Sequence, residues 1–239
     1  MPSWTYNEFK HLGVDFDDPK QVETYETRQN TSMESERALV QRLGIQGNHT
    51  VLEYGAGTGA FALAAAACGA KVIAVDISPA MLAFAGRKSE EMKLNNIDFR
   101  RASYLTHQQP DSSVDFVVTK FALHHLPDFW KVAALRRISR SLKVGGLFYL
   151  QDIVFSFEVD SQVSELENWI EIATRNGSFS REEFEVHIRE EFSTYGFLME
   201  QILSTAGFRI KAANYCSKVQ AEFLCENSSP APPPMTLRE

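Results

Sequence analysis

The sequence predicts a doubly wound α/β domain, in which helices cover both faces of a mostly parallel sheet of about seven strands. Short apolar runs alternate with helical stretches along most of the chain, as they do in strand–helix–strand units. The run Val51-Leu52-Glu53-Tyr54 ends in a glycine-rich turn that opens a helix. A second run ends in Asp76, about 20 residues after the first glycine, where a carboxylate can accept hydrogen bonds from ribose hydroxyls. These features predict a nucleotide-like ligand at the carboxyl ends of the strands.

Length and composition indicate one domain. The chain has 239 residues, of which 44% are hydrophobic and 23% charged, enough for one ordinary α/β core. We expect that domain over residues 1–225, as a monomer or homodimer. The formal net charge is -7 without a long basic run, which disfavours nucleic acid as a partner. We see neither a signal peptide nor an apolar span of membrane length, so the sequence predicts a cytoplasmic protein with no membrane span.

The three cysteines do not have metal-ligand spacing. Cys68, Cys216 and Cys225 are widely separated and lie inside apolar stretches. This pattern favours buried thiols in a reducing compartment over disulfides or a metal site. The sequence therefore predicts no metal ligands.

The first elements follow from local signals. A helical stretch is expected from Val22 to Leu43, which places Tyr25 and Arg28 on one helix face. The glycines of the turn allow close approach of a ligand, and the small residues of the next helix, 60–67, allow it to lie close to the sheet. After the strand 71–75, Ser78-Pro79 has the residue types of a helix start.

The second half of the pattern is similar. An edge strand is expected at 97–100 and a central strand at 114–119, followed by a loop and a helix from Pro127 to the glycine pair 145–146. The apolar run 147–155 is typical of a parallel central strand. A helix at 193–206, with Leu198 among its inward residues, and two strands at 208–215 and 219–225 complete the domain. Residues 226–239 contain four prolines, and we expect a disordered tail.

Glu53 separates two cofactor classes. The glycine pattern alone also fits the dinucleotide fingerprint of dehydrogenases. A carboxylate at the buried end of a strand is unfavourable unless it meets a cation or hydrogen-bond donors. S-adenosylmethionine presents an ammonium and a sulfonium there, whereas a dinucleotide presents a pyrophosphate. With these motifs the sequence resembles the class I S-adenosylmethionine-dependent methyltransferases, in the small-molecule branch similar to ubiquinone and menaquinone methyltransferases.

The resemblance covers roughly residues 47–155 and implies a fold and a cofactor site. The implied strand order is 3-2-1-4-5-7-6, with strand 7 antiparallel, and the implied cofactor is S-adenosyl-L-methionine with S-adenosyl-L-homocysteine as product. Residues 1–45 are expected as a lid over the cofactor and 156–190 as a substrate cap. The implied cofactor-binding residues are Tyr25, Arg28, Glu53, Tyr54, Gly55, Ala56, Gly57, Gly59, Asp76, Ile77, Met81, Ser103, Tyr104 and Lys120.

Several of these assignments have structural alternatives. Tyr25 can pack on the edge of the core while Arg28 is solvated, and Ile77 and Met81 can be simple core residues. The family commonly has an aspartate where this chain has Ser103, and that aspartate binds the adenine amino group. A serine hydroxyl offers one hydrogen bond, so we expect weaker adenine recognition, helped by the backbone of Tyr104.

The catalytic candidates are His124 and His125, in the loop that the family places between cofactor and substrate. Adjacent residues point in different directions, so we expect one of them to face the cavity, with His124 as the choice. A neutral imidazole can accept a proton from the acceptor near neutral pH. Alternatively, the pair bonds backbone groups and positions the loop.

The sequence thus predicts an enzyme that transfers a methyl group from S-adenosylmethionine to an oxygen, nitrogen or carbon of a small molecule. The loop lacks the Asn/Asp-Pro-Pro-Tyr/Phe motif of enzymes that methylate bases, which again disfavours nucleic acid. Two alternatives stay open: a nicotinamide-dependent oxidoreductase, and a non-catalytic protein that binds S-adenosylmethionine. Because the sulfonium is a good leaving group, aligning the two bound molecules can suffice without a dedicated catalytic residue.

Overall fold

The computed structural model describes residues 3–10, 17, 22–23, 25, 32–175 and 180–228. Its strands are β1 Thr50–Tyr54, β2 Lys71–Asp76, β3 Ile97–Arg101, β4 Val114–Lys120, β5 Leu142–Phe155, β6 Thr194–Tyr195, β7 Phe208–Ser217 and β8 Gln220–Asn227. Its α-helices are α2 Met33–Leu43, α3 Ala60–Ala67, α4 Pro79–Glu91, α5 Asp128–Ser141, α6 Gln162–Arg175, α7 Arg181–Glu190 and α8 Gly196–Thr205, with 3-10 turns η1 Leu123–His125 and η2 Val159–Ser161.

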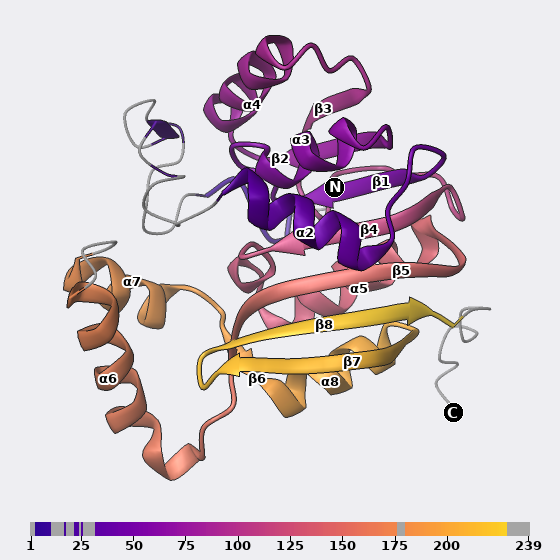
Figure 1. Cartoon of the computed structure of the whole chain (residues 1–239). Coiled ribbons are helices and arrows are strands. Elements are labelled where there is room, and N and C mark those ends of the chain that lie inside the picture. The colour runs from indigo at the N-terminus through magenta and orange to yellow at the C-terminus, as the bar shows by residue number, and fades with distance from the viewer. Residues whose placement is uncertain are drawn as a thin grey trace, which may run out of the picture.

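The strands form one mixed sheet in the order β3-β2-β1-β4-β5-β8-β7 (Figure 1). Strands β3 to β5 are parallel, and β8 runs antiparallel to both β5 and β7. The predicted strand order is confirmed, with β8 and β7 in the places of the predicted seventh and sixth strands. The two-residue β6 beside β5 is additional. The order reverses between β1 and β4, which brings the glycine turn and the loop after β4 to the same edge.

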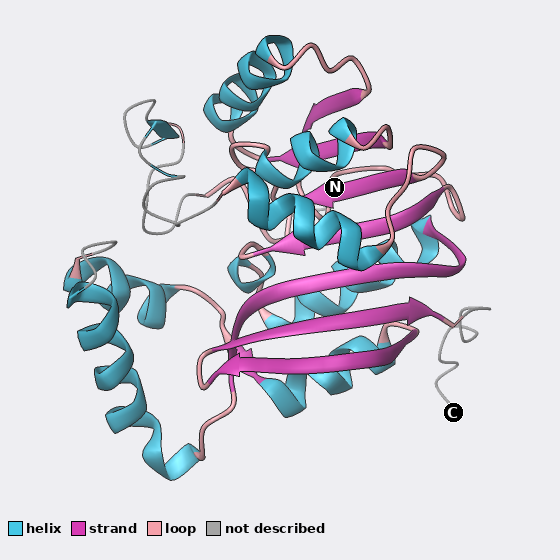
Figure 2. Ribbon diagram, in the orientation of Figure 1, coloured by secondary structure: helices cyan, strands magenta, loops and turns pink. Residues whose placement is uncertain are grey.

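Helices cover both faces of the sheet (Figure 2). On one face, the apolar side of α2 and nearly all of α3 pack on β1 and β2 in one buried cluster. On the other face, α5 and α8 pack on β4, β5 and β8 in a second cluster. Figure 1 shows α6 and α7 standing apart from the sheet at its lower left. The core thus lies between the sheet and the helices α2 and α3 on one face and α5 and α8 on the other. This packing fixes the strand ends that carry the site.

Two glycines of the turn are required by close packing. Gly55 has φ +67°, and a Cβ there would lie 2.3 Å from the Cβ of Ala122 in the loop after β4. Gly59 has φ +78°, and its Cβ would lie 2.7 Å from the Cβ of Ala85 in α4. Both positions have a left-handed backbone, and the backbone of each lies directly against a neighbouring loop or helix. Only glycine allows this combination without strain. The turn is thus wedged between α4 and the loop after β4.

The helix expected to end at Gly145-Gly146 ends at Ser141 instead. Leu142 is already extended and pairs with Val114 of β4, so β5 includes both glycines. Lys143 lies on β5, and its Nζ is 2.7 Å from Asp115 Oδ1 on the neighbouring strand β4. Pairing with β4 outweighs the helical propensity of these residues, as tertiary contacts commonly do.

Other differences concern exposure and strand ends. Cys225 is buried as expected, but Cys68 and Cys216 are exposed, so the prediction of three buried thiols is wrong for two of them. Leu198 is 39% exposed, whereas Met199 and Leu203 take the buried positions of α8. β8 continues to Asn227, beyond the expected strand end, and residues 229–239 of the expected tail lie outside the described residues. No helix within the described ranges is both long and apolar enough to span a membrane.

The close contact between Gly59 and Ala85 allows a test of how tightly the glycine turn is packed. Gly59→Ala is expected to lower the free energy of unfolding by about 1–3 kcal/mol, because it adds a clash with Ala85 to an unfavourable φ. Gly86→Ala, within α4, is the matched control. Apart from the backbone of its own helix, no atom lies within 4 Å of a Cβ added at this position. At position 86 alanine should raise the free energy of unfolding by about 0.5–1 kcal/mol, because alanine has a higher helix propensity than glycine. Urea unfolding of both variants measures the difference, and equal effects would show that the turn is not tightly packed.

Candidate functional site

A cavity lies at the carboxyl ends of β1, β2 and β4, with a volume of about 930 Å³ including space open to solvent. The predicted cofactor residues that line it are Tyr25, Tyr54, Gly55, Gly57, Asp76, Ile77, Met81, Ser103, Tyr104 and Lys120. Residues that sequence reasoning did not select also line it: Tyr6, Glu8, Lys10, Val75, Ala102, Phe121, Ala122 and Leu126.

Three predicted cofactor residues lie behind the cavity wall instead of on it. Glu53 is buried at 3% exposure. Ala56 is buried and its backbone N–H donates to the carbonyl of Val75, and Gly59 packs on Ala85. These residues shape the turn and do not line the cavity. Arg28 lies outside the described residues, so its predicted role stays a prediction.

Buried charge of mixed sign lies beside the turn. Lys120, at the end of β4, forms an ion pair with Glu36 of α2, and the Glu53 carboxyl lies close enough to interact with both. Burial raises the pKa of Glu53 well above its ordinary value; the Lys120 ammonium opposes this shift, and the Glu36 carboxylate adds to it. Glu36 Oε2 and Glu53 Oε2 have no hydrogen-bond partner among the described residues. Two buried carboxyl groups thus share one ammonium.

Glu36 was missed by sequence reasoning, although the sequence contains a signal for it. It is 3% exposed on the apolar face of α2, three and four residues before the buried Leu39 and Val40. A carboxylate at a helical core position is unfavourable without a partner. The buried position of Glu36 therefore indicates that it interacts with a cation, as the buried position of Glu53 does.

Asp76 organises the turn while it lines the cavity. Its Oδ2 accepts from the backbone N–H of Gly57 at 2.7 Å, and its Oδ1 accepts from that of Ser78 at 2.8 Å. Burial raises the pKa of this carboxyl, and these backbone donors oppose the shift. Each carboxylate oxygen has a second lone pair, so these bonds leave capacity for ligand hydroxyls. The ribose role predicted for Asp76 is thus compatible with its contacts to the turn and to the start of α4.

Aromatic rings form one wall. Tyr54 and Tyr104 stack with ring centroids 4.8 Å apart and an interplanar angle of 19°. The Tyr104 hydroxyl shares a hydrogen bond with Thr119 Oγ1 at 2.5 Å. Because burial raises the pKa of both phenols, the wall stays neutral. A flat apolar wall opposite polar groups suits a ligand with one planar part and one charged part.

The N-terminal segment 3–10 closes another side of the cavity. The Glu8 carboxylate accepts from Ser103 Oγ at 2.5 Å, from the backbone N–H of Tyr104 at 3.1 Å and from that of Leu105 at 2.9 Å. Burial raises its pKa, with these donors opposing the shift. Glu8 thus occupies the groups that the sequence assigned to adenine. Sequence reasoning missed it because the contact spans 95 residues along the chain.

The prediction that His124 faces the cavity is wrong: His125 lines it, and His124 is buried and does not belong to the lining. His124 Nδ1 lies 2.5 Å from Asp152 Oδ1, and its Nε2 lies 3.1 Å from Glu191 Oε2. Burial acts to lower the pKa of His124, but Asp152 and Glu191 outweigh it and raise that pKa to about 9. Burial, with the neighbouring His124, lowers the pKa of His125 to about 4. Carboxylates distant in the sequence therefore decide which ring faces inward.

Comparison with known proteins finds a family match over the part of the chain that contains the glycine turn. Residues 51–146 match the family described as a methyltransferase domain. Over this part of the chain, which is less than half of it, the sequence is therefore similar to a methyltransferase domain.

Three similar proteins place this domain. The chain is 32% identical over 114 residues to "Uncharacterized methyltransferase YcgJ" of Bacillus subtilis (strain 168), covering 48% of this chain and 44% of that protein. It is 29% identical over 110 residues to a demethylmenaquinone methyltransferase of Oceanobacillus iheyensis, covering 45% of each. A "SAM dependent methyltransferase from Aquifex aeolicus" has a similar fold, with TM-score 0.62 and 18% identity over 88% of this chain and 98% of that one. The matched regions span less than half the length of the Bacillus subtilis and Oceanobacillus iheyensis relatives.

The charge imbalance at Glu53 yields a stability prediction. Glu53→Gln is expected to raise the free energy of unfolding at neutral pH by about 1–3 kcal/mol, the penalty for an unsatisfied buried group. Because the folded-state pKa of Glu53 is raised, its favourable contribution exists at low pH and is lost as pH rises. The advantage of the variant should therefore grow with pH.

Denaturant unfolding between pH 4.5 and 9 measures this trend. Glu34→Gln, an exposed glutamate on the same helix as Glu36, is the control and should change stability by under about 0.5 kcal/mol at every pH. A variant of Glu53 that is less stable throughout would show that the wild-type carboxylate already has sufficient partners.

Proposed function

We propose that the chain is a methyltransferase that transfers the methyl group of S-adenosylmethionine to an oxygen, nitrogen or carbon atom of a small molecule. The observation that supports this most directly is the pair of buried carboxyl groups, Glu36 and Glu53, beside the Lys120 ammonium that pairs with Glu36, with an unpartnered oxygen on each carboxyl group. A ligand cation beside the glycine turn would restore the charge balance. When bound, S-adenosylmethionine supplies a positively charged sulfonium and a transferable methyl group.

The residues of the cavity fit the parts of that cofactor. We assign its ammonium to the Glu36 and Glu53 region, its ribose hydroxyls to Asp76, and its base to the side lined by Ile77, Met81 and the Tyr104 ring. Glu8 offers the adenine amino group the carboxylate that Ser103 lacks. The backbone at Gly55 and Gly57, free of side chains, lets the ligand lie against the turn.

His125 is the residue placed to receive a proton. It lines the cavity, and its low pKa keeps the ring neutral above about pH 5, so a ring nitrogen can accept a proton from a hydroxyl or amine. A base of that pKa is weak, which agrees with a mechanism that depends mainly on alignment and exclusion of water. His124 instead positions the loop through Asp152 and Glu191.

The predicted substrate cap contributes no described residue to this cavity. The helix α7 meets the loop after β4 through His187, whose ring lies 5.2 Å from that of His124, and through the following Glu191, which contacts His124. The cap, the small-molecule acceptor and the cytoplasmic location therefore stay predictions.

A nicotinamide oxidoreductase is disfavoured by the same carboxylates, because they repel a pyrophosphate. We expect S-adenosylhomocysteine and S-adenosylmethionine to raise the melting temperature, and NAD and NADP to leave it unchanged, since only a ligand that binds the folded state stabilises it. Calorimetric titration checks the assignment. Tight binding of NAD without binding of S-adenosylmethionine would contradict it.

Turnover separates an enzyme from a non-catalytic binding protein. Formation of S-adenosylhomocysteine is to be measured with pooled small-molecule acceptors, and His125→Ala should then lower kcat by about 10²–10⁴-fold if the ring is the base. Its dissociation constant for S-adenosylhomocysteine should hardly change. Cofactor binding without turnover on any acceptor would favour the non-catalytic alternative.

Glu8 gives a separate prediction for the adenine end. Glu8→Ala should weaken S-adenosylhomocysteine binding by about 1.5–3 kcal/mol, the range for a hydrogen bond to a charged group. The loss should be smaller for S-inosylhomocysteine, which has an oxygen in place of the amino group and serves as the matched control ligand. Tighter binding by the variant would instead show that Glu8 blocks the backbone donors of Tyr104 and Leu105.

A further inference from the structure

We propose that His124, His187 and Glu191 form a binding site for a divalent transition metal of the zinc class. The three side chains come from η1, from α7 and from the residue that ends α7. They lie behind the cavity wall, and the sequence spacing gave no sign of them. The proposal rests on side-chain geometry alone and is independent of the proposed function.

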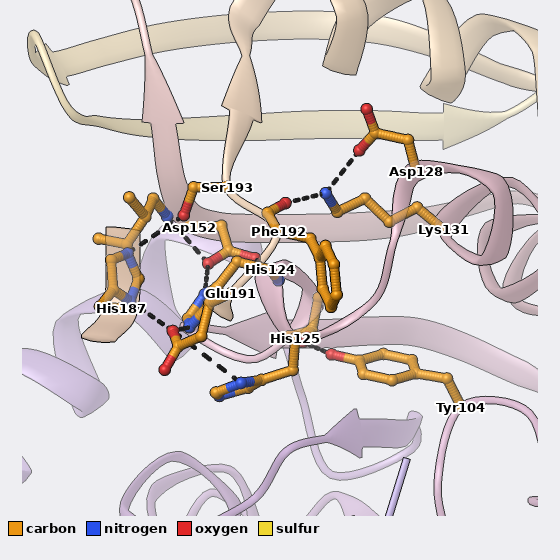
Figure 3. A network of polar contacts seen from close by, with 12 residues as sticks. Tyr104, His124, His125, Asp128, Lys131, Asp152, His187, Glu191, Phe192 and Ser193 are labelled. Atoms are coloured by element: carbon orange, nitrogen blue, oxygen red, sulfur yellow. Dashed lines mark hydrogen bonds and ion pairs between the residues drawn. The ribbon is translucent and has the colours of Figure 1, made fainter. Parts of the chain in front are cut away.

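The three donor atoms converge on one point. Each residue offers one ligand atom, and these atoms all lie within 4.8 Å of one another. His124 Nε2 is 3.1 Å from Glu191 Oε2, and His187 Nδ1 contacts the same oxygen. The two imidazole rings are 5.2 Å apart between centroids and inclined by 64°. Figure 3 shows both rings directed at the Glu191 carboxylate.

The remaining nitrogen of each ring is held from behind. His124 Nδ1 lies 2.5 Å from Asp152 Oδ1, and His187 Nε2 lies 3.2 Å from Ser193 Oγ. Asp152 is fixed in turn, because it accepts the backbone N–H groups of His124 and Ile153. Histidines that bind metals commonly have such a partner on the second nitrogen, which fixes the ring orientation. Here both rings have one.

The cluster is shielded yet close to the cavity. Side-chain exposure is 8% for His124, 9% for Glu191 and 15% for His187. The ring of Trp169 lies 5.5 Å from that of His187, edge to face. His125, which lines the cavity, has its Nδ1 4.0 Å from the same Glu191 oxygen. A metal here would join α7 to the loop after β4 directly behind the cavity.

The donor set indicates the class of metal. Two imidazoles and one carboxylate suit Zn²⁺, Co²⁺ and related ions, whereas Mg²⁺ and Ca²⁺ prefer oxygen donors. Three protein donors leave at least one coordination position for water or another ligand. The alternative is a hydrogen-bonded network that needs no ion, and it predicts no stoichiometric binding.

The test is a Co²⁺ titration of the full chain without an affinity tag, after treatment with a chelator. Cys68→Ser and Cys216→Ser are introduced first, because these two thiols are exposed and would bind the metal themselves. We expect about one Co²⁺ per chain, visible d–d absorption and quenching of tryptophan fluorescence. The quenching should vanish in Trp169→Phe, whereas the absorption should persist. Zn²⁺ added in excess should displace the Co²⁺.

Variants assign the ligands. Glu191→Gln keeps the shape of the side chain and His187→Ala removes one donor; both should abolish the stoichiometric absorption. Asp152→Asn should weaken binding by about 10–100-fold, as expected of a positioning residue. His49→Ala, a histidine outside the cluster whose Nδ1 accepts from the backbone N–H of Gln46, should bind like the parent.

Circular dichroism and urea unfolding verify that each variant is folded. Absence of stoichiometric Co²⁺ and Zn²⁺ binding by the folded parent would overturn the proposal. Binding that persists unchanged in both Glu191→Gln and His187→Ala would overturn it as well.

Discussion

Burial of more carboxylate than ammonium at the end of β1 is the constraint on which the rest of the site depends. Glu53 cannot move away, because its strand is paired on both sides, with Ala74 of β2 and Val118 of β4 opposite it. Lys120 ends β4 and Glu36 lies on the helix that covers this face. The strand order therefore brings these charges together, and their desolvation creates the demand for a cation.

The glycine turn and the N-terminal segment complete this arrangement from two sides. Contacts of Gly55 and Gly59 with Ala122 and Ala85 hold the turn against the loop after β4 and against α4. Asp76 then ties the turn to the start of α4 through backbone donors. Glu8, from the N-terminal segment, contacts Ser103, which lies 95 residues away in the sequence. The cavity is thus lined by the Glu8 carboxyl group and an aromatic wall, and the Glu36 and Glu53 carboxyl groups lie behind the turn.

The His124 region connects the cavity to the helices that stand apart from the sheet. Asp152 is buried in the central strand β5, and it holds His124 in place. Glu191 then links His124 to His187 on α7, and the backbone N–H of Phe192 donates to the carbonyl of His124. This series of contacts couples the position of α7 to the loop that carries His125. A change in the position of α7 is therefore expected to shift the loop that carries His125.

The sequence by itself determined the features that depend on local order. Alternating apolar runs, the glycine turn and the Ser78-Pro79 helix start predicted the parallel strands and the helices between them, because these signals act within about 20 residues. The family resemblance, and not these signals alone, implied most of the residues that line the cavity. Glu53 also indicated a cation, since a strand interior is buried wherever the strand lies. The strand order and the cofactor were inferred from resemblance, and the structure and the comparisons agree with both.

Only the tertiary structure decided which distant side chains meet. Nothing local distinguishes His124 from His125; the buried Asp152 and Glu191, far along the chain, turn one ring inward to the protein and leave the other to the cavity. Glu8 and Glu36 acquire their roles from partners in other segments. Leu142 is extended only because β4 offers it a partner. In each case the deciding interaction joins segments whose proximity exists only after folding, and sequence periodicity does not encode it.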